Sequence, residues 1–140
     1  MTDANSQEGA EQVSSLDQDD ASRPDGLDKR RHARVHCGYP IRIVTPRGMR
    51  VTGRMRDLSE SGLAFTFEAS AAAGLRLDVT FSVLLPGGSR TVKAETRVVY
   101  SRLSSDKYLI GVEFSSITSD NLETIKAYVD YRQKPRNTTL

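Results

Sequence analysis

Five residues in two short motifs offer the clearest chemistry in this sequence. Arg30 and Arg34 form an R-x-x-x-R motif, and Asp57, Ser59 and Gly62 form a D-x-S-x-x-G motif after a strand-like interval. Guanidinium groups bind phosphates in a bidentate manner, and a short polar turn offers hydrogen-bonding groups at close range. In this order and at this separation, the two motifs predict complementary halves of a site for a nucleotide phosphate.

The second motif also has a purely structural interpretation. D-x-S-x-x-G suits an ordinary turn between strands, in which the side chains of Asp57 and Ser59 cap their own turn by bonding to the backbone. The upstream arginines favour ligand contact over this alternative. Gly62 is expected either to let the backbone approach a ligand ring or to supply a turn with positive φ.

Charge is distributed unevenly along the 140 residues. Residues 1–28 contain eight acidic residues and one arginine, so 19 of the 20 basic residues and ten of the 18 acidic residues lie in 29–140. The acidic tail has few apolar residues and no aromatic residue, and it is therefore predicted to be disordered. The remaining body carries a net charge near +9, which favours an anionic partner.

Signals for membrane insertion, secretion, metal binding and catalysis are weak. No stretch approaches the roughly 18 consecutive apolar residues of a membrane helix, and the N-terminus lacks a secretory pattern, so a cytoplasmic location without membrane insertion is expected. His32 and His36 flank the single cysteine, Cys37, without the carboxylates that would complete a metal site. No metal or cofactor is expected. Since there is no paired-carboxylate cleft signature and no nucleophile-and-base motif, a non-enzymatic role is expected.

The elements that would position the two motifs are strands. Alternating apolar residues predict six of them, with short turns and no helix between, at 39–44, 49–57, 63–67, 75–83, 91–100 and 109–114. Six such strands favour a closed antiparallel barrel, because closure removes exposed edges. The predicted fold class is therefore all-β with a C-terminal helix.

The helix is expected to be capped by Asp120. Three apolar residues share one face and are predicted to pack on the barrel: Leu122, Ile125 and Val129. Tyr128 and Tyr131 are expected to rest their rings on the barrel rim. The expected organisation is an ordered domain at 29–132 followed by a flexible C-terminus at 133–140.

With both motifs in this order on a small barrel with a C-terminal helix, the sequence resembles the PilZ domain family over residues 29–132. The Gly-Val-Glu-Phe segment at 111–114 is similar to the glycine-containing final strand of that family. Family members are bacterial receptors for the second messenger cyclic di-GMP, so the resemblance implies a six-stranded antiparallel PilZ-type barrel that binds this nucleotide. It places five residues at ligand-contacting positions: Arg30, Arg34, Asp57, Ser59 and Gly62.

The chemistry of these residue types fits that ligand, which carries two phosphodiester charges and two guanine rings. A guanidinium group matches either a phosphate or the O6/N7 edge of guanine. The carboxylate of Asp57 can accept hydrogen bonds from guanine N1–H and N2–H, and Ser59 can donate or accept at short reach.

Four further positions each keep two interpretations. Lys29 stands where the resemblance implies control over whether one ligand or a stacked pair is bound, and a cation there is compatible with two molecules per chain. Arg31 contacts a phosphate or points to solvent. Tyr100 lies where family members often carry a tryptophan that stacks on guanine, but it also suits a core or rim position. Arg102, on the same strand face, adds a cation to the site or is simply solvated.

The leading functional prediction is a non-enzymatic receptor. Cyclic di-GMP would order the loop from Lys29 to Arg34 and thereby engage or release an unidentified partner protein, in a pathway such as motility or exopolysaccharide synthesis. The acidic tail is hypothesised to lie over the basic site when no ligand is bound. The chain is expected to be a monomer or a weak dimer.

Two alternatives compete with this prediction. A nucleic-acid-binding barrel would suit the charge, but the phenylalanines alternate as core residues do and leave no stacking platform, so nucleic acid is not expected as a partner. A PilZ-like adaptor that no longer binds the nucleotide is disfavoured by the intact motif set.

Overall fold

The computed structural model describes residues 32–134. The predicted acidic tail at 1–28 lies outside the described residues, as do Lys29, Arg30 and Arg31. Residues 135–140 also lie outside the described residues. The first two residues of the predicted flexible C-terminus are described: Gln133 is the last residue of the helix and Lys134 is its C-cap. The barrel described below begins after Ala33.

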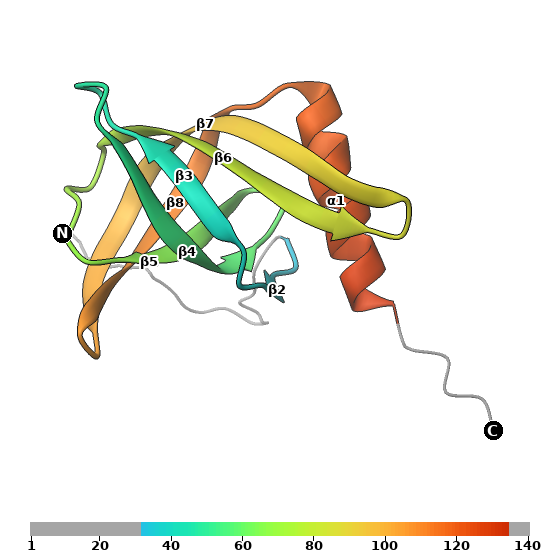
Figure 1. The fold of residues 1–140 in the computed structure, drawn as a ribbon, viewed down its shortest axis with the longest axis horizontal. Helices are drawn as coiled ribbons and strands as arrows, with labels where there is room; N and C mark the ends of the chain where they lie inside the picture. The colour runs from blue at the N-terminus through green and yellow to red at the C-terminus, as the bar shows by residue number, and fades with distance from the viewer. Residues whose placement is uncertain (1–31, 135–140) are drawn as a thin grey trace, which may run out of the picture. The chain divides into compact units, whose positions relative to one another are not determined.

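The described residues form strands followed by one helix. In chain order, they are β2 (Val35–His36), β3 (Pro40–Val44), β4 (Arg50–Leu58), β5 (Gly62–Phe67), β6 (Arg76–Leu85), β7 (Gly88–Ser104), β8 (Lys107–Ser116) and α1 (Ser119–Gln133). Hydrogen-bonded neighbours run in the order β2-β4-β3-β6-β7-β8-β5, and β5 also pairs with β4. This last pairing closes β3 to β8 into a six-stranded antiparallel barrel (Figure 1), which confirms the predicted fold class.

The additional strand, β2, was not predicted. Val35 pairs with Leu58 and His36 pairs with Asp57, so β2 continues the edge of β4 on which β3 lies. Two residues are too few to show an alternating pattern, and only the partner strand reveals the element. β2 matters for function because it fixes the residue just before it, Arg34, beside the end of β4.

The core lies inside the barrel and under α1. Inward-facing residues of β3 and β6 such as Ile41, Ile43, Val79, Phe81 and Val83 are almost fully buried. The helix packs against β6 and β7 beside their long hairpin (Figure 1). Burial of this apolar surface is the main contribution to the stability of the fold.

Two predictions about the helix are wrong in detail. Its N-cap is Thr118, whose side chain accepts a hydrogen bond from the Asn121 backbone, and Asp120 lies in the first turn instead. Tyr128 is not on the rim but is 1% exposed, because it lies one turn after Ile125 on the buried face. Tyr131 is 47% exposed.

The apolar face of α1 otherwise follows the prediction. Ile125 and Val129 are buried against the barrel, whereas Leu122 is only partly buried and borders a hollow beside β8. The ring of Tyr128 meets the ring of Tyr39 edge-on, at 5.9 Å between centroids, which ties the helix to the segment before β3.

Candidate ligand-binding site

A register shift in β4 turns Asp57 outward. Met55 is buried, so strict alternation would place Asp57 inside and Leu58 outside. Instead, the pairing with β5 skips Arg56 between Met55 and Asp57. Such an extra residue reverses the alternation that follows it. As a result Leu58 is fully buried, and Asp57 faces outward with its side chain 21% exposed.

A second register shift, in β7, turns Tyr100 outward in the same way. Val98 pairs with Val112 and Tyr100 pairs with Gly111, so Val99 is the extra residue. Val98 and Val112 are buried in the core, whereas Tyr100 is half-buried on the outer wall. Without this shift, alternation from Val98 would place Tyr100 in the core.

The two outward residues end one row across four strands. Asp57 of β4 pairs with Ala64 of β5, Ala64 pairs with Gly111 of β8, and Gly111 pairs with Tyr100 of β7. Since paired strands lie about 4.8 Å apart, the Cα atoms of Asp57 and Tyr100 are separated by roughly 14 Å. The row therefore has a carboxylate at one end, an aromatic ring at the other and two small residues between them. We call it the site row.

Gly111 is required by the position of the Tyr100 ring. A Cβ atom built on Gly111 would overlap the Cε2 and Cζ atoms of Tyr100, so the ring lies directly over the glycine. The guanidinium carbon of Arg102 lies 5.3 Å from the centre of the same ring, within the range of a cation–π contact. Arg102 thus adds a positive charge next to the aromatic end of the site row.

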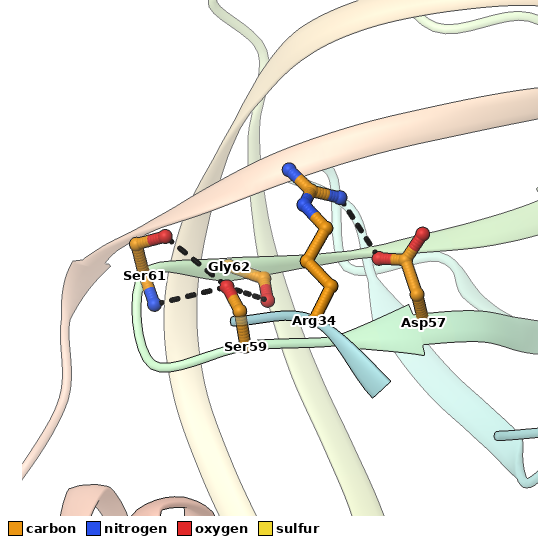
Figure 2. A network of polar contacts seen from close by, with 5 residues as sticks. All are labelled: Arg34, Asp57, Ser59, Ser61 and Gly62. Atoms are coloured by element: carbon orange, nitrogen blue, oxygen red, sulfur yellow. Dashed lines mark hydrogen bonds and ion pairs between the residues drawn. The ribbon is translucent and has the colours of Figure 1, made fainter. Parts of the chain in front are cut away.

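Arg34 of the first motif meets Asp57 of the second. Its Nη1 atom donates to Asp57 Oδ1 at 2.9 Å, across 23 positions of sequence (Figure 2). The side chains are 32% and 21% exposed, so the pair is accessible. The structure therefore brings one residue of each motif together. The side chain of Asp57 bonds to Arg34 and, within the described residues, not to the backbone of its own turn, so the capping alternative is wrong for Asp57.

Ser59, by contrast, has the contacts of a turn residue. It is 1% exposed, and its backbone N–H donates to the carbonyl of Gly62 at 2.9 Å. Its Oγ atom accepts from the backbone N–H of Ser61 at 3.2 Å (Figure 2). Its hydroxyl also lies within hydrogen-bonding distance of Ser61 Oγ and the Gly62 carbonyl. A ligand contact by Ser59 remains a prediction, since in this structure its side chain stabilises the turn.

Gly62 is needed for a different reason from one of the two predicted. The described glycines with positive φ are Gly48, Gly74 and Gly88, so the suggestion of positive φ at Gly62 is wrong. A Cβ atom on Gly62 would overlap the backbone carbonyl of Val112, because β8 passes very close to the start of β5. The glycine allows this close approach of two strands.

A hollow of about 440 Å³ lies over this part of the barrel. Its lining includes Arg34, Glu60, Gly62, Tyr100, Gly111 and Glu113. The volume lies within the roughly 300–1,000 Å³ of ordinary small-molecule sites. The carboxylates of Glu60 and Glu113 supply hydrogen-bond acceptors to the hollow, and Arg34, paired with Asp57, supplies a positive charge. The rest of the lining is largely apolar, and Arg102 lies beside the hollow on the Tyr100 ring.

The remaining predicted residues are not assembled into this site by the described structure. Lys29, Arg30 and Arg31 lie outside the described residues. His36 is exposed on β2, and within residues 32–134 no group of three or more His, Cys, Asp and Glu side chains could hold a metal ion. Cys37 is half-buried, and burial raises the pKa of its thiol to about 11, so the thiol is protonated and unreactive at neutral pH.

Sequence reasoning missed several residues of the site row and the hollow: Ala64, Glu60, Glu113 and Val99. The sequence does contain a signal for the site row, because the alternation of apolar and polar residues is interrupted in β4 and in β7. Met55 and Leu58 are both core types at an odd separation, and Val98, Val99 and Tyr100 are consecutive large residues in an alternating strand. Such breaks indicate a bulge, and bulges often re-aim side chains near functional sites.

Comparison with known proteins identifies the family. The sequence model of the PilZ domain matches residues 28–131. The chain belongs to the PilZ domain family. PilZ domains are in general ligand-binding receptors, and solved members include complexes with cyclic di-GMP. No curated protein matches the sequence significantly.

Solved structures show the same fold at low sequence identity. The inhibitor of motility MotI from Bacillus subtilis matches with a TM-score of 0.70 and 19% identity, over 77% of this chain and 54% of that chain. The PilZ domain of YcgR from Escherichia coli, solved with cyclic di-GMP, matches with a TM-score of 0.57 and 11% identity, over 75% and 92%. MrkH from K. pneumoniae in its apo state matches with a TM-score of 0.59 and 17% identity, over 75% and 50%.

This PilZ chain thus spans about half the length of the MotI and MrkH chains and nearly all of the YcgR domain. Among the described residues, no helix is both long and apolar enough to cross a membrane.

Proposed function

We propose that this PilZ domain is a non-enzymatic receptor for cyclic di-GMP and that it binds the nucleotide over the site row. The observation that carries the proposal is the convergence of Arg34, Asp57 and Tyr100 on one outer surface of the barrel, beside a hollow of about 440 Å³. Two register shifts, one in β4 and one in β7, are needed to bring Asp57 and Tyr100 to this surface.

The chemistry of the row suits a guanine base. Tyr100 presents a half-buried ring for stacking. This ring covers Gly111, and Ala64 beside it is fully buried, so the two small residues form the floor of the row beneath the ring. The carboxylates of Asp57 and Glu113 can accept hydrogen bonds from guanine N1–H and N2–H. An adenine base lacks this pair of donors, so the acceptors favour cyclic di-GMP over cyclic di-AMP.

The phosphates require cations that the site row supplies only in part. Arg34 is paired with Asp57, and the carboxylates of Glu60 and Glu113 also line the hollow. In our proposal Arg30 and Arg34 bind the phosphates together, with Ser59 and Gly62 contacting the ligand at the turn. Arg31 and Arg102 add positive charge, and Lys29 accommodates the phosphate of a second stacked molecule, so that one or two ligands bind per chain.

Ligand binding is proposed to act on a partner protein. When Arg30 and Arg34 bind the same ligand, the segment from Lys29 to Arg34 becomes fixed beside the nucleotide, and the surface offered to a partner changes. The solved complexes of the YcgR domain and of MrkH with cyclic di-GMP support the choice of ligand. The partner, the pathway and a cytoplasmic location remain predictions.

Calorimetric titration of the full chain with cyclic di-GMP tests this proposal. Arg34→Ala removes a charge-assisted contact and is expected to cost about 1.5–3 kcal/mol, or roughly tenfold or more in Kd. The matched control is Arg76→Ala, because Arg76 also faces a carboxylate, Glu95 at 3.6 Å, but on an exposed part of β6 and β7. Arg30→Ala is expected to behave like Arg34→Ala, and a stoichiometry near two would support the role given to Lys29.

Two outcomes would contradict the proposal. If Arg34→Ala bound the nucleotide as tightly as the parent chain, the site would lie elsewhere. If cyclic di-AMP bound as tightly as cyclic di-GMP, the acceptor groups of Asp57 and Glu113 would not be reading the base.

A further inference from the structure

The outer surface of β3 and β4 carries a concentration of arginines that the ligand site does not use. Residues 38–56 contain five arginines and no acidic residue. Four of these arginines are exposed on the outer wall of the barrel, one on β3 and three on β4: Arg42, Arg50, Arg54 and Arg56. We call these four residues the arginine face.

Their charges are not balanced by carboxylates within residues 32–134. None of the ion pairs formed among these described residues includes a member of the arginine face. Arg54 donates from Nη1 to the backbone carbonyl of Gly38 at 2.6 Å, which fixes the side chain with a neutral acceptor and leaves its charge uncompensated. In the described part of the chain, two carboxylates lie beside the face: Asp57 follows Arg56 on β4 and pairs with Arg34, and Glu68 lines one depression together with Arg54 without forming an ion pair with it.

Hydroxyl groups lie between the cations. Thr52 of β4 pairs with Arg42 of β3, Arg42 pairs with Thr80 of β6, and Thr80 pairs with Lys93 of β7. This cross-strand row therefore alternates a hydroxyl with a positive charge. Both groups donate hydrogen bonds to carboxylate oxygens, so the row favours an acidic partner.

Two hollows flank β4 on this wall. One, of about 540 Å³, is lined in part by Tyr39, Arg42, Thr52 and the exposed Leu84; the other, of about 330 Å³, is lined in part by Thr52, Arg54 and Lys107. Thr52 lines both. Protein interfaces commonly place anchoring side chains in such depressions, surrounded by a polar rim.

The arginine face lies largely apart from the candidate ligand site, and Arg56 is the member that adjoins the site, next to Asp57 on β4. Around the closed ring of strands β4-β3-β6-β7-β8-β5, β3 with Arg42 is three strands from β8, and on β4 Arg50 and Arg54 precede the end of the strand at which Asp57 lies. No residue lines both the ligand hollow and either hollow of the arginine face. The two surfaces can therefore be occupied at the same time.

We propose that the arginine face is a docking surface for an acidic segment of a partner protein. The carboxylates of that segment pair with Arg42, Arg50, Arg54 and Arg56, and its side chains enter the two hollows. An extended segment places alternate side chains about 6.7 Å apart, the same spacing as Arg50, Thr52, Arg54 and Arg56 along β4. This inference does not depend on the identity of the nucleotide proposed above.

Other anionic partners fit less well. Single-stranded nucleic acid binds through stacking platforms, but the one aromatic side chain lining the larger hollow besides the buried Phe81 is Tyr39, whose ring packs on Tyr128 and whose hydroxyl accepts from the Leu84 backbone. A protein that makes about 6–10 phosphate contacts on duplex DNA needs more cations than the four arginines of this face. A membrane surface would require an apolar face beside the cations, whereas the large exposed apolar side chains bordering the arginine face within residues 32–134 are two single residues, Met49 and Leu84.

The test is a binding measurement of the full chain with a fluorescent poly-glutamate peptide at low salt. The variant Arg42→Gln/Arg54→Gln is expected to weaken binding by about tenfold or more. The control Arg76→Gln/Arg90→Gln removes the same charge from exposed positions of β6 and β7 and is expected to change Kd by less than about twofold. Because Arg54 also bonds to Gly38, the variant Arg42→Gln/Arg50→Gln serves as a second test that leaves this contact intact.

Competing probes decide the chemistry of the partner. A short DNA duplex, a thymidine oligonucleotide and phosphatidylserine vesicles are measured in parallel, and each is expected to bind more weakly than the peptide. Tighter binding of any of these probes through the same arginines would overturn the proposal. So would a failure of the parent chain to bind the peptide, or a loss of peptide binding in Arg76→Gln/Arg90→Gln as large as in Arg42→Gln/Arg54→Gln. Titration with cyclic di-GMP is expected to be unchanged in the arginine-face variants. A failure of nucleotide binding in the parent chain would contradict only the proposed function.

Discussion

Two tyrosine–arginine pairs in this PilZ domain have nearly the same geometry in different surroundings. Arg132 lies 5.5 Å from the ring centre of Tyr128, and Arg102 lies 5.3 Å from that of Tyr100. Tyr128 is 1% exposed, packs on Tyr39 and has its hydroxyl bonded to Arg132 at 2.5 Å. Tyr100 is half-buried over Gly111, and no residue of the described part of the chain hydrogen-bonds to its hydroxyl.

The comparison shows that a cation–π contact does not by itself reveal the role of a pair. Tyr128 is buried, its ring joins α1 to the barrel through Tyr39, and its hydroxyl bonds to Arg132 on the same helix, so this pair has a structural role. Partial exposure beside a hollow leaves Tyr100 and Arg102 available to a ligand. The two pairs should therefore respond in opposite ways to the same substitution.

The largest expected difference is in folding stability. Tyr128→Ala leaves a cavity between the helix and the barrel and is expected to lower the free energy of unfolding by about 3–5 kcal/mol. Tyr100→Ala removes a ring from the outer wall and is expected to cost less than about 1 kcal/mol. Urea denaturation of both variants measures this difference. Equal losses would mean that Tyr100 is also a core residue.

Gly62 and Gly111 differ in whether an added side chain would meet backbone or a side chain. Gly62→Ala would force apart two strands, because its Cβ atom meets the Val112 carbonyl, and is expected to cost about 1–3 kcal/mol of stability. Gly111→Ala meets only the movable Tyr100 ring, so it is expected to cost less stability while lowering the affinity for cyclic di-GMP. Denaturation and calorimetry on the same two proteins check both parts. If Gly111→Ala bound cyclic di-GMP as tightly as the parent chain, the Tyr100 ring would not be in contact with the ligand.

A smaller effect is expected on ligand affinity when the exposed ring is removed. Tyr100→Ala should weaken cyclic di-GMP binding by about 0.5–1.5 kcal/mol, since stacking is lost, whereas Tyr100→Phe keeps the ring and should bind normally. Tyr128→Phe is the matched control in the buried pair, and its affinity should be unchanged. If Tyr128→Phe weakened cyclic di-GMP binding more than Tyr100→Ala did, Tyr128 rather than Tyr100 would be the tyrosine that acts in ligand binding.

The smallest expected effect appears only at high pH. Burial raises the pKa of Tyr128 from 10.0 to about 12, with the hydrogen bond to Tyr39 adding to the shift. In the unfolded chain this phenol ionises near 10.0, so between pH 10 and 12 the unfolded state binds fewer protons than the folded state. Stability contributed by Tyr128 therefore falls as the pH rises through this range. Denaturation of Tyr128→Phe should show a shallower decline, and a parallel decline would contradict the buried phenol.

Much of the fold could be predicted from alternation alone. The apolar residues of β3 and β6 alternate regularly because one face of each strand is buried, and these strands lie where they were expected. β2 has too few residues for any pattern. The cap at Thr118 was missed because Asp120 is an equally good capping type, and only backbone geometry separates the two.

The candidate site was harder to predict because its geometry depends on register. The motifs identified Arg34 and Asp57, but whether Asp57 and Tyr100 point inward or outward depends on one extra residue in each strand, Arg56 and Val99. The pairing of four strands then decides that Ala64 and Gly111 lie between them. Sequence spacing within one strand contains no information on such cross-strand neighbours.

The most direct test of the account is a two-dimensional amide NMR titration of the isotopically labelled full chain with cyclic di-GMP. The site row predicts the largest shift changes at Ala64, Gly111 and Tyr100, together with residues of the turn at Ser59, and little change at Arg42 on the opposite wall. Binding that shifted the amides around Arg42 and left Ala64 and Gly111 unmoved would contradict the assignment of the site row as the ligand-binding surface.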